Sequence, residues 1–169
     1  MRGLAIIAGL LAALPAYAPA SAQLTVTPRE EAVAAADTFF AALRSENKAA
    51  LAEVMIPEAV IFVHNHMDAE NPRVSIVPVS EHLKRWANRT AQFDERMIYS
   101  EVMISGDMAH VWGPYAFWVE GEITHCGINS LSLVKQDGMW KVGNTSFTME
   151  DPDLCPVLGA PMLRGGIGQ

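Results

Sequence analysis

The sequence predicts an α+β fold in which N-terminal helices pack on a strongly curved antiparallel sheet and form a cone with a cavity. Three observations predict it: helical hydrophobic spacing after Thr27, long strand-like runs after Phe93, and short turn signals between those runs. Helices followed by antiparallel strands are typical of α+β domains. Because a helix laid across a bent sheet leaves the open end of the cone unfilled, a small ligand would bind there.

The composition is that of one globular domain with a core of its own. The chain has 169 residues, of which 50% are hydrophobic and 18% are charged, so it is long enough and apolar enough to fold. Its formal net charge is -7. This acidic balance argues against binding to nucleic acid or to an anionic membrane surface, because both require a basic face.

Residues 1–22 are expected to be a signal peptide outside the fold. Arg2 supplies a positive start, the apolar run Leu4–Leu14 is too short to span a bilayer, and Ala20-Ser21-Ala22 matches a cleavage site. Cleavage there would leave a mature chain that begins at Gln23 and is periplasmic or secreted, with no membrane attachment. The alternative is a retained membrane anchor.

The first helix is expected from a start signal followed by an apolar stripe. Thr27 is a candidate N-cap, Pro28 stands at the first helical position and Glu30 completes a capping box. A second, short helix ends before Pro57, and a third begins after Ser80. Helices are therefore predicted over residues 28–46, 48–55 and 81–90, the last carrying Trp86.

The strands are expected from runs rich in β-branched and aromatic residues. Turn signals at Gly106, Gly121 and Gly138 separate the last four runs, which predicts a meander of long antiparallel strands. The domain is expected to cover residues 23–150, and the Pro- and Gly-rich segment 151–169 to be an irregular tail. The predicted strands are 59–64, 74–77, 94–104, 108–119, 122–135 and 139–149.

The stretch Ala109–Val142 carries four features in a fixed order: a Val-Trp-x-x-Tyr strand, an acidic-Gly turn, the motif Thr-His-Cys-Gly, and an Asp-Gly-x-Trp hairpin. In this it resembles the nuclear-transport-factor-2-like (NTF2-like) superfamily with its cystatin-like cone fold, and within it the bacterial group named for lumazine binding. The resemblance covers about Pro28 to Glu150. The superfamily includes isomerases, dehydratases, cyclases and members without chemistry, so the fold does not settle the function.

Alternation along strand 122–135 indicates which side chains face the cavity. One face holds Ile123, His125, Asn129 and two leucines and should point toward the helices, whereas Cys126 points away. His125 is then either a catalytic acid or base, or a hydrogen-bonded histidine that only shapes the pocket. The expected ligand-binding residues are Tyr115, His125, Asn129, Val111, Trp86 and His64.

The two cysteines are expected to have a structural role that does not involve His125. Because Cys126 and His125 point to opposite faces of a strand, a nucleophile–base pair is not expected, although a bulge at Gly127 would change this locally. Cys126 is therefore a structural thiol or half of a disulfide with Cys155, which an oxidising compartment would allow.

No metal or cofactor is expected. His64 and His66 share a strand face, but a metal site needs three or four ligands in fixed geometry, and a strand end entering a polar loop explains the pair. An isomerase or dehydratase would need a carboxylate buried in the cone with a raised pKa, and the candidates Asp37 and Glu101 are weak.

The second face of strand 108–119 carries Trp112 and Trp118, two large apolar side chains that another surface is expected to shield from water. The resemblance and the apolar patch favour a homodimer formed through this face, and burial under the tail is the alternative. Three functions remain open: an exported protein that binds a small apolar or aromatic ligand, an enzyme in which His125 moves a proton while Tyr115 or Asn129 holds an oxyanion, and a homodimeric interaction module whose cavity is only core.

Overall fold

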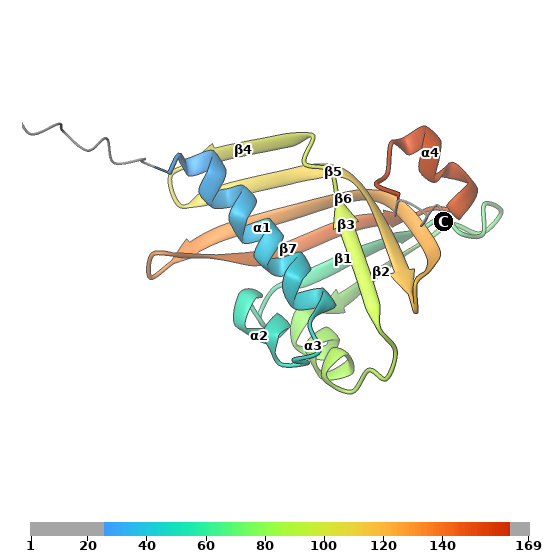
Figure 1. Ribbon diagram of the computed structural model, residues 1–169, viewed down its shortest axis with the longest axis horizontal. Coiled ribbons are helices and arrows are strands. Elements are labelled where there is room, and N and C mark those ends of the chain that lie inside the picture. Colours follow the sequence, from blue (N-terminus) through green and yellow to red (C-terminus); the bar gives the residue numbers. More distant parts are fainter. Residues whose placement is uncertain (1–25, 163–169) are drawn as a thin grey trace, which may run out of the picture.

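The computed structural model describes residues 26–162, so the expected signal peptide and its cleavage site lie outside the described residues. Helices and a curled sheet follow each other in the expected order (Figure 1). The helical elements are α1 (Pro28–Arg44), α2 (Ala50–Val54), α3 (Val79–Ala87), the 3-10 turn η1 (Pro152–Leu154) and α4 (Cys155–Leu158). The strands are β1 (Val60–Asn65), β2 (Arg73–Pro78), β3 (Phe93–Met97), β4 (Glu101–Ser105), β5 (Met108–Val119), β6 (Glu122–Gln136) and β7 (Met139–Met149).

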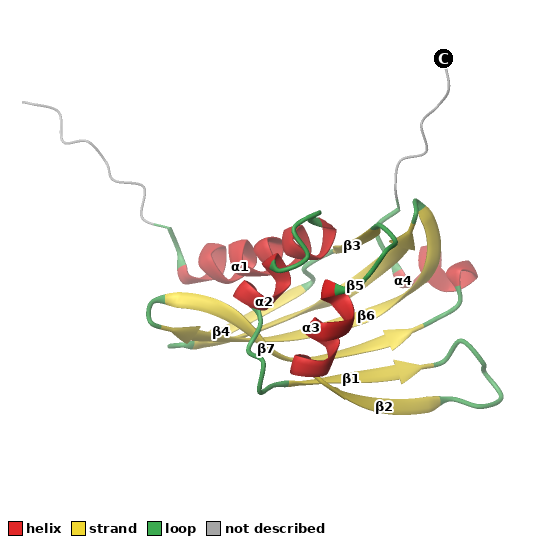
Figure 2. Cartoon of the chain, turned by 90° about the horizontal axis from the view of Figure 1, so that it is seen from below, coloured by secondary structure: helices red, strands yellow, loops and turns green. Residues whose placement is uncertain are grey.

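The sheet has seven strands in the order β2-β1-β7-β6-β5-β3, and β4 pairs with the other end of β5. All neighbours are antiparallel except β1 and β7, which run parallel. Helices α1, α2 and α3 lie on one side of the curled sheet (Figure 2). This confirms the predicted α+β cone. No helix within residues 26–162 is long and apolar enough to cross a membrane.

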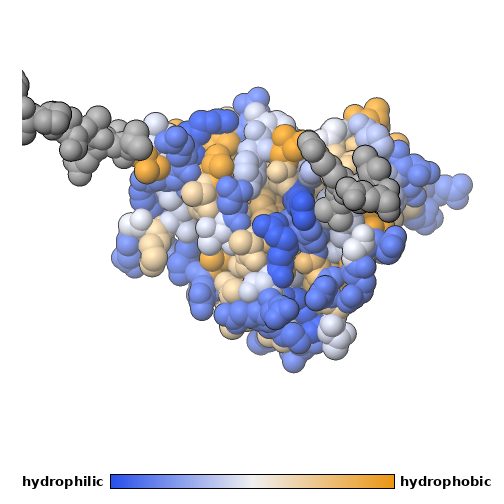
Figure 3. Space-filling view, in the orientation of Figure 1, coloured by the Kyte–Doolittle hydropathy of each residue, from blue (hydrophilic) through white to orange (hydrophobic). Residues whose placement is uncertain are grey.

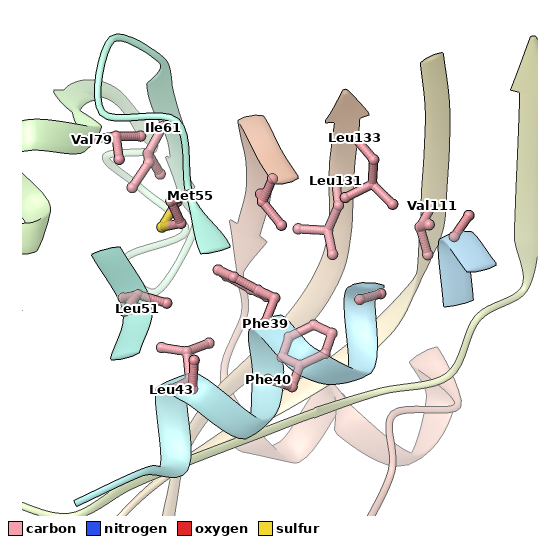
Figure 4. Packing of buried hydrophobic residues seen from close by; sticks show 14 of the residues in the cluster. Phe39, Phe40, Leu43, Leu51, Met55, Ile61, Val79, Val111, Leu131 and Leu133 are labelled. Carbon is pink, nitrogen blue, oxygen red and sulfur yellow. The ribbon is translucent and has the colours of Figure 1, made fainter. Parts of the chain in front are cut away.

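Helix α1 begins where its capping box predicts. The Thr27 hydroxyl accepts a hydrogen bond from the Glu30 backbone N–H (3.2 Å), and the Glu30 carboxylate accepts one from the Thr27 N–H (2.7 Å). Its apolar stripe turns toward the sheet, where Phe39 and Phe40 face the leucines of β6 (Figure 4). This packing forms the main core at the closed end of the cone.

One long strand was expected over residues 94–104, but the structure divides it into β3 and β4. Between them the Ile98 backbone N–H donates to the carbonyl of Pro114, and Ile98 approaches β5 at Gly113, where a Cβ would overlap the Ile98 carbonyl oxygen. Proline has no N–H to offer a partner strand, so pairing along this edge of β5 is interrupted at Pro114, between the partners of β3 and those of β4. Helix α3 also begins earlier than expected, at Val79, with Pro78 as its N-cap residue.

The chain after Glu150 is ordered, not irregular, up to the end of the described part. A disulfide joins Cys126 on β6 to Cys155 at the start of α4. Around it Ala116, Trp118, Ile123 and Ala160 form a second small core. Trp118 is only 3% exposed because this segment covers it, whereas Trp112 is 44% exposed.

Candidate functional site

A cavity of about 420 Å³ opens inside the cone, between the helices and the concave face of the sheet. Its wall is mostly apolar, with a small number of polar side chains from α3, β3, β5, β6 and β7 among them, as is usual for small-molecule sites. Polar groups of the wall include those of His82, Glu95, Tyr115, His125 and Asn129.

The structure brings four of the expected ligand-binding residues together and leaves two outside. Tyr115, His125, Asn129 and Trp86 all line the cavity. Val111 is instead fully buried in the core, where α1 covers that part of β5.

His64 also lies outside the cavity lining. Ile61 and Val63 of β1 face the cavity, so alternation turns His64 to the opposite side, where its Nε2 lies 3.0 Å from the Ser146 hydroxyl. His66 lies just beyond the end of β1, where its Nδ1 is 2.7 Å from the Glu150 carboxylate. Within residues 26–162 there is no cluster of three or more His, Cys, Asp or Glu side chains that would hold a metal ion.

Glu95 is the site residue that sequence reasoning missed. It lies on β3 with 9% of its surface exposed, and one of its carboxyl oxygens accepts a hydrogen bond from Asn129 Nδ2 at 2.8 Å. Burial raises the pKa of Glu95 to about 8, and the Asn129 hydrogen bond only partly opposes this. At neutral pH its carboxyl group therefore mostly holds its proton. The sequence does contain an indication of this burial, because Glu95 alternates with the apolar residues Phe93 and Met97 on one face of a strand.

The other carboxylate candidates lie elsewhere. Asp37 accepts a hydrogen bond from the Tyr99 hydroxyl at 2.5 Å, outside the cavity, and Glu101 is exposed on β4. A buried carboxyl group with a raised pKa is thus present in the cone, but at Glu95.

His125 is half-buried among rings. Its imidazole stacks on Phe117 with ring centroids 5.0 Å apart and meets the edge of Tyr115 at 5.8 Å. Burial lowers the pKa of His125 to about 4, so the ring is neutral at neutral pH. The sulfur of Cys126 is held in the disulfide on the other face of β6, which excludes it as the partner nucleophile.

Two buried polar atoms in the cavity wall have no hydrogen-bond partner: Nε1 of Trp86 and Oδ1 of Asn129. Leaving such an atom unpaired costs about 1–3 kcal/mol. Both atoms are almost inaccessible to water, so a ligand would pair with them only after a small movement of the wall. Tyr115 differs, because its hydroxyl donates to the Thr148 carbonyl at 2.7 Å. The hydroxyl proton of Tyr115 is therefore used within the protein and is not available to stabilise an oxyanion on a substrate, the role expected from the sequence.

Aromatic and imidazole rings follow one another beside the cavity, all but Phe93 among its lining residues, and we call this series the aromatic wall. Neighbouring ring centroids lie 4.9 to 5.9 Å apart along it. At its outer end burial lowers the pKa of His82 to about 4, with a smaller effect from Arg85, so this histidine is also neutral. The aromatic wall consists of His82, Trp86, Phe93, Phe117, His125, Tyr115 and Phe147.

Comparison with known proteins places the fold. No protein-family profile and no curated protein sequence matches the chain. Among solved structures it is similar to an NTF2-like protein of unknown function from Shewanella baltica OS155, with a TM-score of 0.53 and 15% identity over 74% of this chain and 98% of that one.

Two further structures carry descriptions of a function. One is described as a "putative dehydratase" of the NTF2-like family from Streptomyces avermitilis (TM-score 0.56, 15% identity, 72% of this chain and 94% of that one). The other is the beta subunit of a "putative aromatic-ring-hydroxylating dioxygenase" from Novosphingobium aromaticivorans DSM 12444 (TM-score 0.58, 9% identity, 72% and 88%). At these identities the likeness establishes the NTF2-like fold alone.

Proposed function

We propose that this protein binds a small, mostly apolar, uncharged organic molecule in the cone cavity. The observation that carries the proposal is a cavity of about 420 Å³ whose wall is mostly apolar and holds a small number of polar side chains. Trp86 and Asn129 in this wall each keep a buried polar atom without a partner, whereas polar atoms in a solid core are normally paired. A charged ligand is disfavoured because Glu95, His82 and His125 are all neutral at neutral pH in this low-dielectric space.

We further propose that the protein works outside the cytoplasm and belongs to the lumazine-binding group. The expected signal peptide supports export, and the Cys126–Cys155 disulfide is typical of an oxidising compartment. The Thr-His-Cys-Gly motif on β6 supports the group, and its His125 lines the cavity.

A second candidate function is acid–base catalysis on the same ligand. The observation that favours it is that the pKa of Glu95 is raised to about 8 while that of His125 is lowered to about 4 in one cavity. Shifted groups of this kind can divide the roles of acid and base between them, Glu95 giving a proton and His125 taking one. The dehydratase description of the Streptomyces avermitilis protein fits this chemistry by analogy of fold.

Native mass spectrometry of protein purified from a periplasmic extract tests the binding function. A discrete retained mass that is lost in His125→Ala but kept in His64→Ala would support it, since only the first histidine lines the cavity. Wild-type protein that carries no retained mass and binds no small molecule would favour the third function, an interaction module with a solid core.

Incubating the protein and its retained ligand in heavy water, and then measuring the ligand mass, distinguishes catalysis from binding. An acid–base enzyme would exchange a carbon-bound hydrogen of the ligand for deuterium, and Glu95→Gln would abolish the exchange while leaving the ligand bound. A ligand mass that stays unchanged with wild-type protein would leave binding as the function.

A further inference from the structure

Thr124 is the extra residue of a β-bulge at the cavity wall. Phe117 of β5 pairs with His125 of β6, but the next residue, Trp118, pairs with Ile123, so Thr124 has no partner across the ladder. Bulges re-aim side chains, and this one reverses the expected alternation for Ile123, which packs against the second core. The Thr124 hydroxyl lies beside the His125 ring as a result, with Oγ1 3.0 Å from Nδ1.

The hydrogen bonds of Thr124 determine which nitrogen of His125 carries the proton. A hydroxyl group has one hydrogen to donate, and Thr124 Oγ1 has two neighbours within reach: the Phe117 carbonyl at 3.3 Å and His125 Nδ1 at 3.0 Å. Both contacts become hydrogen bonds in one arrangement only, in which the hydroxyl donates to the carbonyl and its oxygen accepts from Nδ1–H, so that Nε2 keeps its lone pair. Within residues 26–162 Nε2 has no hydrogen-bond partner, and the ring lines the cavity.

Asn129 lies further along the same strand, and its free oxygen is almost inaccessible to water. Asn129 uses its Nδ2 on Glu95, which leaves Oδ1 unpartnered and buried on a residue only 3% exposed. The single cationic residue among the cavity-lining residues, Arg85, is exposed and lies 3.9 Å from the Glu81 carboxylate. The accessible acceptor on β6 is therefore Nε2 of His125, which a donor on the ligand would satisfy beside the flat faces of the aromatic wall.

We propose that the cavity selects an uncharged aromatic molecule that donates a hydrogen bond from a ring-attached O–H or N–H group, and that Thr124 is the positioning residue that makes His125 an acceptor. This inference rests on the proposed ligand-binding function and names the chemistry of its ligand. An anionic ring would lose its hydration in a mostly apolar cavity whose cationic lining residue, Arg85, is exposed and lies beside Glu81. An aliphatic ring would lose the favourable contact with the ring faces.

The ligand class is tested with three probes of similar size: 2-naphthol, 2-methoxynaphthalene and 2-naphthoate, titrated calorimetrically into wild-type protein. We expect 2-naphthol to bind at least about tenfold more tightly than either of the others, because a buried acceptor left unpaired costs about 1–3 kcal/mol. Equal or tighter binding of the methyl ether or the carboxylate would overturn the inference and leave the binding function intact. Binding of no probe overturns the inference; if native mass spectrometry also shows no retained ligand, the binding function falls with it.

The role of Thr124 is tested by the tautomer of His125, which nitrogen NMR of the imidazole reports directly. We expect Nδ1–H in wild type and in Thr124→Ser, and a shift toward Nε2–H in Thr124→Val, with 2-naphthol affinity reduced several-fold only in the last. Thr38→Val makes the same change on the exposed face of α1 and should alter neither property. A wild-type spectrum with Nε2 protonated would overturn the assignment even if Thr124→Val did not fold, and so would a folded Thr124→Val with an unchanged tautomer.

Discussion

Glu95 shows how the fold keeps an acidic side chain uncharged. An ionised carboxylate in this position would have Asn129 Nδ2 as its hydrogen-bond donor and little water to replace the others. Losing the proton is therefore unfavourable, which is why the pKa of Glu95 rises to about 8. The protonated group can act both as a hydrogen-bond donor to a ligand and as a proton source.

Replacement of Glu95 by Gln should change how stability depends on pH. The pKa of Glu95 is about 8 in the folded protein and near its model value of 4.5 in the unfolded chain. Between these values the unfolded chain releases a proton that the folded protein retains, so wild-type stability falls as pH rises through this window. Gln cannot ionise, so its side chain does not cause this loss. The free energy of unfolding of Glu95→Gln should therefore rise relative to that of wild type by more than about 1 kcal/mol from about pH 5 to about pH 8.

Urea unfolding of both proteins across this window measures the effect. His125 and His82 act in the opposite direction, because their folded pKa values are lowered to about 4 and their contribution is lost as pH falls below 6.5. Both histidines are present in both proteins, so their effect cancels in the difference. A difference in the free energy of unfolding that does not change with pH would contradict the assignment of a raised pKa to Glu95.

At the scale of elements, local signals located most of the fold. The capping box at Thr27 starts α1, and the turns at Gly121 and Gly138 have the positive φ angles, 84° and 79°, that favour glycine in tight hairpins. These features depend on neighbouring residues only, which is why the sequence was sufficient. Sheet closure and the β1–β7 parallel pairing depend on contacts between distant residues and were not visible.

The candidate site was predictable only in part, and the reason is also local geometry. Simple alternation placed His125 and Asn129 at the cavity, but it failed for Ile123 because the bulge at Thr124 shifts the register. Glu95 alternates with Phe93 and Met97 on one face of β3, but its burial depends on contact with Asn129 of β6, which is distant in sequence and not visible from alternation.

Gly127, the last residue of the Thr-His-Cys-Gly motif, should tolerate no side chain. A Cβ there would overlap the carbonyl of Thr148, the group that accepts the Tyr115 hydroxyl, and would meet the Thr148 hydroxyl at 2.5 Å. Because the obstacle is backbone, strands β6 and β7 would have to separate, and we expect Gly127→Ala to lower the free energy of unfolding by about 1–3 kcal/mol.

Gly143→Ala is the matched control, since its Cβ would come no closer than 3.4 Å to any neighbour outside its own chain segment. Denaturant unfolding of the two variants gives the comparison. Equal stability of Gly127→Ala and Gly143→Ala would show that β6 and β7 approach less closely at the motif than the structure indicates.

At the scale of the whole molecule, the disulfide ties the C-terminal segment to the outer face of the sheet. It closes a loop of 29 residues, so replacing both Cys126 and Cys155 by Ala should lower the free energy of unfolding by about 3 kcal/mol. Release of the segment would also expose Trp118, and its fluorescence should shift to the red. Unchanged stability and fluorescence in the double variant would show that the second core holds without the bond.

The outer face of the sheet also bears on assembly, where homodimerisation stays a prediction. Trp112, Met103 and Met108 are 44%, 59% and 61% exposed and alternate away from the core on adjacent β4 and β5. The helix-covered face instead shows apolar residues scattered among hydrophilic ones (Figure 3). Exposed apolar side chains gathered on one face of a monomer favour a partner surface, and we expect the partner to be a second copy of this chain.

Light scattering on the eluting protein should therefore report a dimer for wild type and a monomer for Trp112→Glu, because a charge at the centre of the patch would be buried without a partner. Val157→Glu places the same charge on an exposed apolar residue of α4, outside the patch, and should stay dimeric. Trp112→Glu should keep the affinity for 2-naphthol, since Trp112 is on the opposite face of β5 from Tyr115 and the cavity. A wild-type protein that elutes as a monomer would contradict the predicted homodimer and would leave the proposed ligand-binding function unaffected.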